Sequence, residues 1–432
     1  MFLNLLADLG PYPADAGYEE ATARDAADPL ADFRSRFVSD DPNLIYLDGN
    51  SLGRLPRKAI RLIDEVVEGQ WGDRLIRSWN EGWWDLQLEL GDLMAPLIGA
   101  APGDVIISDS TSVNLFKLAM AAVQSRPGRH TIVTDDLNFP SDVYVLGGIA
   151  RMLGDQYRLV VIESDGVHGP LDALADSIDS DTALVSLSHT SFKSGYTYDL
   201  GVMTRMAHDA GALVLWDLSH SVGAVPIDLG GSNTDLAVGC TYKYLNGGPG
   251  SPAFLYVRSD LQSTLENPIT AWWGHTDPFA LDLDFVPTPG IRRFHTGTMP
   301  IVSMAAIRAG VNDVAEAGMD RIRSKSVLLS DYVISMWETH LEGLGFTLGS
   351  PRDPAWRGSH VALAHPEGWP ITRALIDAAS VIPDFRAPDT LRFGLSPLYT
   401  SFLDVHTAIL RLKAVVETGI YEDFRHVSVT VT

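Results

Sequence analysis

The chain has 432 residues, of which 46% are hydrophobic, and its 55 acidic residues against 32 basic ones give a formal net charge of −23. This length exceeds what one small core usually holds, so it predicts a large domain with a smaller partner. No run of Lys or Arg offers the basic surface that nucleic acid or anionic lipid requires, and we expect neither as a partner.

A single cysteine, Cys240, excludes a disulfide framework and a Cys-rich metal site. The histidines show no ligand spacing such as H-E-x-x-H, so no metal is expected. The N-terminus lacks a positively charged leader, and no apolar run approaches the roughly 18 residues of a membrane span. We therefore expect a cytoplasmic protein without a membrane partner.

Short apolar runs recur from about residue 45 to 260 and predict strands. Several are almost continuously apolar, as strands buried on both faces should be, and helical segments lie between many of them. The pattern predicts an α/β domain with a mostly parallel sheet. The predicted strands are Ile45–Leu47, Val105–Ile107, Thr131–Val133, Leu159–Ile162, Leu184–Leu187, Leu213–Trp216 and Ala253–Val257.

One predicted helix begins directly after the polar segment Asp109-Ser-Thr-Ser112, just past a strand. The free N–H groups and the dipole at such a helix end favour an anion such as a phosphate. Thr111 and Ser112 fit that role. Simple N-capping explains the same residues, and one helix end can do both.

Beyond about residue 300 the pattern changes and predicts a smaller α+β domain. Its elements are a long helical segment, two apolar runs and a final helix: Val302 to about Leu344, Ser359–Ala364, Thr390–Phe393 and Phe402–Glu417. We divide the chain into an N-terminal arm packed on the small domain, a large domain and the small domain: residues 1–44, 45–304 and 305–432.

Three polar residues around the predicted strand Leu213–Trp216 form the pattern that a pyridoxal-5′-phosphate (PLP) site needs. Asp217 ends the strand, His220 lies three residues on, and Lys243 follows 26 residues after Asp217. A lysine amine binds the cofactor aldehyde, and a carboxylate keeps the pyridine nitrogen protonated so that the ring accepts electrons. His220 would orient the ring.

Each of these residues alone has an ordinary explanation. Asp217 alone fits a helix cap, His220 a satisfied hydrogen-bond partner, and Lys243 a surface charge. However, Lys243 lies between two tyrosines and just before the Gly-rich segment 246–250, which allows the backbone to approach a ligand closely. Together the residues favour a cofactor site on Lys243.

Seven sequence blocks, in this order, resemble those of the kynureninases. They are Ile45–Gly53, Trp71–Trp79, Asn138–Asp142, Asp217–His220, Tyr242–Gly250, Trp272–His275 and Leu391–Tyr399. The resemblance spans nearly the whole chain. Any one block is shared with related PLP enzymes, but the set is far more specific.

The resemblance implies a PLP-dependent homodimer of fold type I. Phe139 would stack on the ring, Asp142 and Asp217 would bond its polar atoms, and Ser188 and His220 would lie beside it. Thr111, Ser112 and Tyr242 would hold the phosphate, while Trp272 and Thr298 would reach it from the neighbouring subunit. Each active site would then lie at the dimer interface.

For the substrate, the resemblance assigns Arg392 to the α-carboxylate, which a guanidinium group grips with two parallel hydrogen bonds. The alternative is an ordinary surface arginine. However, Arg392 lies within an otherwise apolar predicted strand, which favours a buried, functional role. Asn50 and Trp71 are further substrate-binding candidates. An aryl pocket could involve Trp71, Trp79, Trp83 or Trp84, although such a cluster more often belongs to a core.

The implied reaction is hydrolysis of L-kynurenine to anthranilate and L-alanine in tryptophan catabolism, with a link to NAD biosynthesis. Lys243 would act as the base and Tyr242 as a proton relay. The Trp-rich stretch favours kynurenine, and 3-hydroxykynurenine stays open as a second substrate.

Three alternatives remain: a cysteine desulfurase or selenocysteine lyase, an aminotransferase, and a non-catalytic PLP-fold binding protein. A desulfurase needs a mobile thiolate, and Cys240, on a probable strand three residues before the lysine, cannot serve as one.

Overall fold

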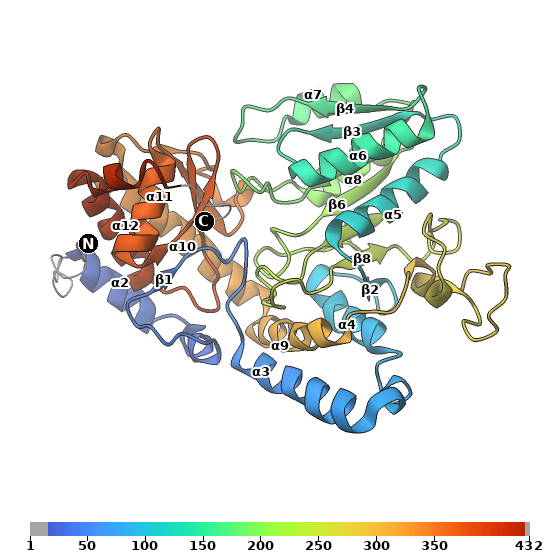
Figure 1. Cartoon of the computed structure of the whole chain (residues 1–432). Helices are drawn as coiled ribbons and strands as arrows, with labels where there is room; N and C mark the ends of the chain where they lie inside the picture. The colour runs from blue at the N-terminus through green and yellow to red at the C-terminus, as the bar shows by residue number, and fades with distance from the viewer. Residues whose placement is uncertain (1–15, 428–432) are drawn as a thin grey trace.

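The computed structural model describes residues 16–427 and contains two sheet-bearing parts that lie side by side (Figure 1). The larger sheet has seven strands in the order β2-β8-β7-β6-β5-β3-β4. Only β8 runs against its neighbours, so the prediction of a mostly parallel sheet is confirmed. The strands are β2 (Val105–Ile107), β3 (Thr131–Asp135), β4 (Arg158–Ile162), β5 (Thr182–Ser188), β6 (Leu213–Asp217), β7 (Leu236–Gly239) and β8 (Phe254–Val257).

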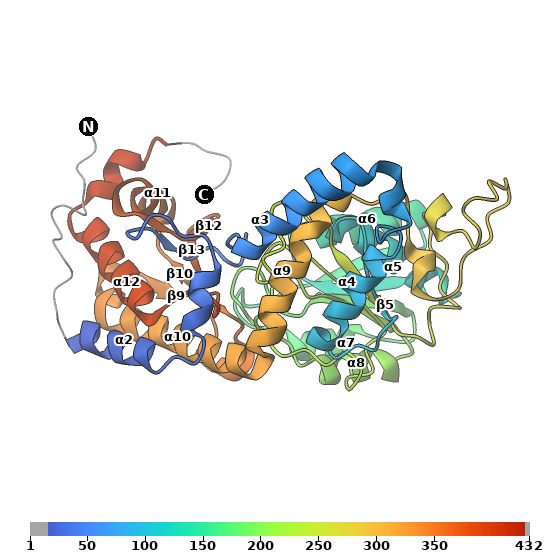
Figure 2. The same cartoon turned by 90° about the horizontal axis from the view of Figure 1, so that it is seen from below.

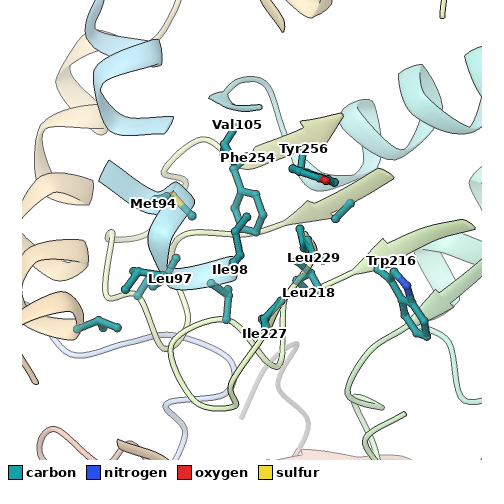
Figure 3. Close-up of a cluster of buried hydrophobic side chains, with 14 of the residues drawn as sticks. Met94, Leu97, Ile98, Val105, Trp216, Leu218, Ile227, Leu229, Phe254 and Tyr256 are labelled. Atoms are coloured by element: carbon teal, nitrogen blue, oxygen red, sulfur yellow. The ribbon is translucent and has the colours of Figure 1, made fainter. Parts of the chain in front are cut away.

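Both faces of this sheet are buried except at the edge strand β4, because alternate residues of the other strands enter different cores. In β2, Ile106 packs with one apolar cluster, while Val105 and Ile107 pack with the other. Figure 3 shows the second cluster, in which Met94 and Ile98 lie close to Val105 and Phe254.

Helices cover the two faces of the large sheet. One cluster joins the sheet to α5 and α6, and the other joins it to α4, α7, α8 and α9. The helices of this part are α3 (Arg57–Asp64), α4 (Leu86–Met94), α5 (Thr111–Gln124), α6 (Pro140–Leu153), α7 (Leu171–Ser177), α8 (Leu200–Asp209) and α9 (Ile301–Ala317).

The smaller part has a four-stranded antiparallel sheet in the order β12-β13-β10-β9, packed with helices. The predicted final helix is confirmed as α12. The elements are α10 (Met319–His340), β9 (Thr347–Leu348), β10 (His360–Ala364), α11 (Gly368–Ala379), β11 (Val381–Ile382), β12 (Asp384–Arg386), β13 (Thr390–Gly394) and α12 (Phe402–Glu417).

Shorter helical segments connect these elements. The 3-10 segments are Ala31–Arg36, Leu75–Trp79, Ala95–Ile98, Trp272–Gly274, Gly290–Phe294, Glu342–Leu344, Pro354–Trp356 and Ile420–Phe424. A π-helix, Glu65–Arg74, continues α3. None of the helices within residues 16–427 is long and apolar enough to cross a membrane.

Two sequence predictions are wrong in detail. The first strand, β1 (Ile45–Tyr46), pairs with β11 and is not part of the large sheet, because Ile45 and Leu47 pack into the core of the smaller part. The long helical segment is two helices, α9 and α10, separated by Gly318 with a left-handed φ of 79°. α9 runs beside α3, as Figure 2 shows, whereas α10 contacts α12.

Although the sequence places a probable strand at Cys240, the predicted strands do not include β7 itself. Its run of four residues ends in a glycine, which weakens any strand pattern. Cys240 lies directly after this strand and is not within it.

The N-terminal segment contacts the smaller part through α2 (Ala16–Ala26), which packs on α12. Asp28 forms an ion pair with Lys325 of α10 at 2.6 Å, and both side chains are buried. Asp25 accepts hydrogen bonds from the first N–H groups of α12. Residues 1–15 of the predicted arm lie outside the described residues, and the bounds of the three-part division stay a prediction.

Candidate active site

A cavity of about 610 Å³ lies at the carboxyl end of the parallel strands, where the large sheet meets the smaller part. Side chains from β6, the starts of α5 and α6, and the small sheet line it. Ten residues singled out from the sequence belong to the lining: Asn50, Thr111, Ser112, Phe139, Asp142, Asp217, His220, Tyr242, Lys243 and Arg392.

Lys243 projects into this cavity beside His220. Its Nζ lies 3.0 Å from His220 Nε2 and 5.9 Å from the centre of the Phe139 ring. Burial lowers the pKa of Lys243, and burial together with the Lys243 charge lowers the pKa of His220 well below its usual value. His220 is therefore a neutral imidazole at physiological pH, and the lysine loses its proton more readily than an exposed one.

Gly53 brings another segment of the chain directly against this lysine. The Gly53 N–H donates a hydrogen bond to the Tyr242 carbonyl at 2.8 Å. A Cβ atom at position 53 would lie 2.3 Å from the Lys243 carbonyl oxygen. Only glycine permits this contact.

Asp142 and Asp217 place two buried carboxylates close together. Burial and the neighbouring Asp217 raise the pKa of Asp142 well above its usual value. Its Oδ2 is buried without a hydrogen-bond partner among residues 16–427, while Asp217 Oδ1 accepts the Ser219 N–H at 2.8 Å. Such a pair needs a donor or a positive charge, and a protonated pyridine ring supplies both. The residues present thus fit PLP.

The starts of α5 and α6 meet at another wall of the cavity. Ser110 caps α5 by accepting the Val113 N–H at 3.4 Å, and Ser112 Oγ lies 2.9 Å from Ser141 Oγ at the start of α6. The start of α5 therefore offers free N–H groups, and the Ser112 and Ser141 hydroxyls lie beside it, as a cofactor phosphate requires.

Asp109, directly before this turn, has a left-handed φ of 43°. Its carboxylate pairs with the buried Lys117 at 2.7 Å and accepts the Thr296 hydroxyl at 2.9 Å. These contacts fix the turn in place.

Four predicted site residues lie outside the cavity lining. Ser188 ends β5 and donates a hydrogen bond to Asn138 Oδ1 at 2.7 Å, and the same oxygen accepts the Phe139 N–H. Ser188 thus supports the turn that carries Phe139, and its direct contact with a cofactor stays a prediction.

The other three are Trp71, Trp272 and Thr298. Trp71 lines a neighbouring apolar cavity together with Trp83. Trp272 is 40% exposed and contacts Trp84 and Trp273, and Thr298 is exposed. Their roles therefore stay predictions.

Arg392 lies on β13 and is fully buried. Its guanidinium group pairs with Asp384 and donates to the Phe192 carbonyl. Burial lowers the pKa of Arg392 to about 10, so it stays protonated at neutral pH. Its Nε has no partner in the described part of the chain, and neither do the side-chain oxygen and nitrogen of the buried Asn50. The wall therefore retains donors and acceptors for a polar ligand.

Sequence reasoning missed several lining residues, including Ser51, Ser141 and Arg386. Ser51 and Ser141 lie inside blocks that the resemblance had already marked, so their positions carried a signal. Arg386 carried none, because its strand β12 has only three residues.

Removing one of the paired carboxylates should change how stability depends on pH. A raised pKa means that the folded protein binds more protons than the unfolded chain above pH 3.8, so folding stability falls as pH rises through the raised pKa. Asp142→Asn removes that loss. In the absence of cofactor, the free energy of unfolding of the variant should exceed that of the wild type by about 1–3 kcal/mol at pH 8. The gap should close toward pH 4, and denaturant titrations at both pH values measure it; an equal gap would contradict the carboxylate coupling.

Two sequence profiles of known families match parts of the chain. The sequence profile described as "Kynureninase C-terminal domain" matches residues 322–412, and that described as "Aminotransferase class-V" matches residues 87–348. A kynureninase from Burkholderia pseudomallei (strain 1106a) is 47% identical over 93% of this chain and 95% of its own. The kynureninase of Pseudomonas fluorescens is 43% identical over 92% and 95%.

Solved structures share the fold at lower sequence identity. The apo cysteine desulfurase from Thermococcus onnurineus NA1 has a TM-score of 0.76 and 21% identity, covering 90% of this chain and 98% of its own. The cysteine desulfurase CsdA from Escherichia coli has a TM-score of 0.75 and 16% identity over 90% and 98%. These likenesses support the fold, and the sequence relatives decide the family. The chain belongs to the kynureninase family of PLP-dependent enzymes.

Proposed function

We propose that the protein hydrolyses L-kynurenine to anthranilate and L-alanine, with PLP bound on Lys243. The observation that carries this proposal is the convergence of Lys243, the Asp142–Asp217 pair and Arg392 in one cavity. These groups would bind the aldehyde, the ring nitrogen and the substrate carboxylate respectively. Tryptophan catabolism, a link to NAD biosynthesis and a cytoplasmic location belong to the same proposal.

Bound PLP supplies an electron sink that stabilises negative charge at the substrate Cα and prepares the Cβ–Cγ bond for hydrolysis. Lys243, whose pKa is lowered by burial, takes the Cα proton as its neutral amine. The neighbouring Cys240 and burial raise the pKa of Tyr242, which keeps it a phenol that can pass a proton. Arg392 holds the carboxylate, so the Cα–H bond is presented to the lysine.

A desulfurase activity fits this chain poorly, despite the shared fold. Cys240 is 1% exposed, and burial raises the pKa of its thiol. A buried thiol with a raised pKa forms little thiolate and cannot reach a substrate sulfur.

We also propose a homodimer in which Trp272 and Thr298 complete the site of the neighbouring subunit. The segment between β8 and α9 projects from the sheet (Figure 1). It also exposes large apolar side chains. Phe279 is 72% exposed and Leu281 79%. An apolar surface of this kind is typical of a subunit contact.

Anthranilate fluorescence tests the reaction. The PLP-loaded protein should release anthranilate from L-kynurenine with ordinary saturation kinetics, and kcat/KM should be at least about tenfold lower with 3-hydroxykynurenine. Equal kcat/KM values would contradict the substrate preference. A protein that binds PLP but turns over neither compound would contradict the proposed reaction.

A further inference from the structure

Arg386 is a second guanidinium group in the wall of the cavity. It lies on β12, whose register with β13 sets Asp384 opposite Arg392 and Arg386 opposite Thr390. Alternate residues of a strand, and residues opposite each other on neighbouring strands, share one face of a sheet. Asp384, Arg386 and Arg392 therefore point to the same side, and both arginines line the cavity.

Asp384 holds both arginines. Its Oδ1 accepts from Arg386 Nη1 at 2.7 Å, its Oδ2 pairs with Arg392 Nη2, and its side chain is 1% exposed. Burial lowers the pKa of both guanidinium groups, but both stay protonated at neutral pH. Asp48 is a second carboxylate near both guanidinium groups, but burial raises its pKa and so disfavours its charged form. The two guanidinium groups that share the Asp384 carboxylate therefore retain N–H donors for an anionic ligand.

The Ser51 hydroxyl lies within reach of both guanidinium groups. Its Oγ lies 3.3 Å from Arg392 Nη2 and 3.5 Å from Arg386 Nη2. A hydroxyl group at these distances is a weak, neutral acceptor. A carboxylate oxygen near the same point would form charge-assisted hydrogen bonds, which are shorter and about twice as strong.

We propose that Arg386 binds the substrate α-carboxylate together with Arg392, and that Asp384 orients both guanidinium groups as their common counter-ion. The proposal rests on the proposed function, because it takes an α-amino acid as the substrate. It also defines the substrate class: two guanidinium groups select a free α-carboxylate against the corresponding amide or amine.

The test uses the PLP-loaded protein and two ligands. L-alanine, the proposed product, is titrated while the visible absorbance of the cofactor is followed, and KM and kcat are measured with L-kynurenine. In Arg386→Gln, the Kd of L-alanine and the KM should rise roughly 10- to 100-fold, with kcat changed less than about threefold. Arg386→Lys should recover part of the loss. Arg352→Gln, at an exposed ion pair with Glu338, should match the wild type.

A double variant separates direct binding from support of Arg392. If Arg386 acts only by holding Arg392 in place, Arg386→Gln adds no further loss of L-alanine affinity to Arg392→Gln. Direct binding predicts a further loss. The decarboxylated analogue of kynurenine should bind Arg386→Gln as tightly as the wild type.

An unchanged Kd for L-alanine in Arg386→Gln, or no added loss in the double variant, would overturn the inference. A wild type that binds L-alanine without hydrolysing L-kynurenine would overturn the proposed reaction alone. A wild type that binds neither would overturn both.

Discussion

Lys243→Ala should lower the turnover of L-kynurenine by at least about 10³-fold, because the variant loses both the covalent attachment of the cofactor and the base at Cα. The variant should still fold, since within residues 16–427 the Lys243 Nζ lies within hydrogen-bonding distance of His220 alone. Borohydride treatment of the PLP-loaded wild type should abolish a visible absorbance band and label the peptide that contains residue 243. The variant should carry no label there.

The control is Lys413→Ala, which removes a half-exposed lysine on α12. It should keep wild-type activity and labelling. If Lys243→Ala kept more than a few per cent of the activity, or if the label appeared on another lysine, the assignment of the cofactor lysine would be wrong.

The same variant tests the shared active site. Mixing Lys243→Ala subunits with Trp272→Ala/Thr298→Ala subunits should restore activity, because a hybrid dimer contains one intact site. With random exchange, half the dimers are hybrids and half of their sites are intact, giving about a quarter of the wild-type activity. If the mixture of the two inactive variants stayed inactive although subunit exchange had been demonstrated, the shared active site would be contradicted.

Lys325→Met should destabilise the fold by about 3–5 kcal/mol, because it leaves the buried Asp28 carboxylate without its partner at 2.6 Å. Methionine keeps most of the side-chain volume, so the loss reports the charge and not a cavity. This is a large fraction of the roughly 5–15 kcal/mol that stabilises a typical protein. The urea unfolding midpoint measures the change, and limited proteolysis should show earlier cleavage near residues 16–44.

An exposed pair gives the comparison. Lys413→Ala removes the partner of Glu417 at 3.7 Å and should cost less than about 1 kcal/mol. The double variant Asp28→Asn/Lys325→Met should be more stable than Lys325→Met, since it leaves no buried charge. If Lys325→Met and Lys413→Ala lowered the free energy of unfolding equally, the buried ion pair would contribute no more to stability than the exposed one.

The sequence predicted those parts of the molecule that depend on local patterns. Six apolar runs mark strands of the large sheet, and polar residues before an apolar helix mark the start of α5. Asp217 and Lys243 could be paired because a strand end and a Gly-rich turn have recognisable residue types. Their environment could not be predicted, since the lowered pKa of His220 comes from burial and from Lys243 and Arg392, which are distant in sequence.

The errors arise where tertiary pairing decides the outcome. Ile45–Tyr46 has an ordinary strand composition, and nothing local specifies that its partner is Val381–Ile382, more than 300 residues later. The role of Ser188 follows from its contact with Asn138, which depends on how β5 and the turn after β3 meet. Arg386 gains its place in the cavity only through the register of a three-residue strand.

Gly53 has a consequence for anyone who redesigns this enzyme. Asn50 and Ser51 line the cavity; Asn50 is fully buried, whereas the Ser51 side chain can be exchanged to alter the choice of ligand. At Gly53 the same segment lies against the Lys243 backbone, where even one added carbon has no room. A mutational library of residues 48–53 should therefore vary the positions on the cavity side and keep Gly53 unchanged. This glycine sets the position of the Lys243 backbone, and so of its amine, without contacting a ligand.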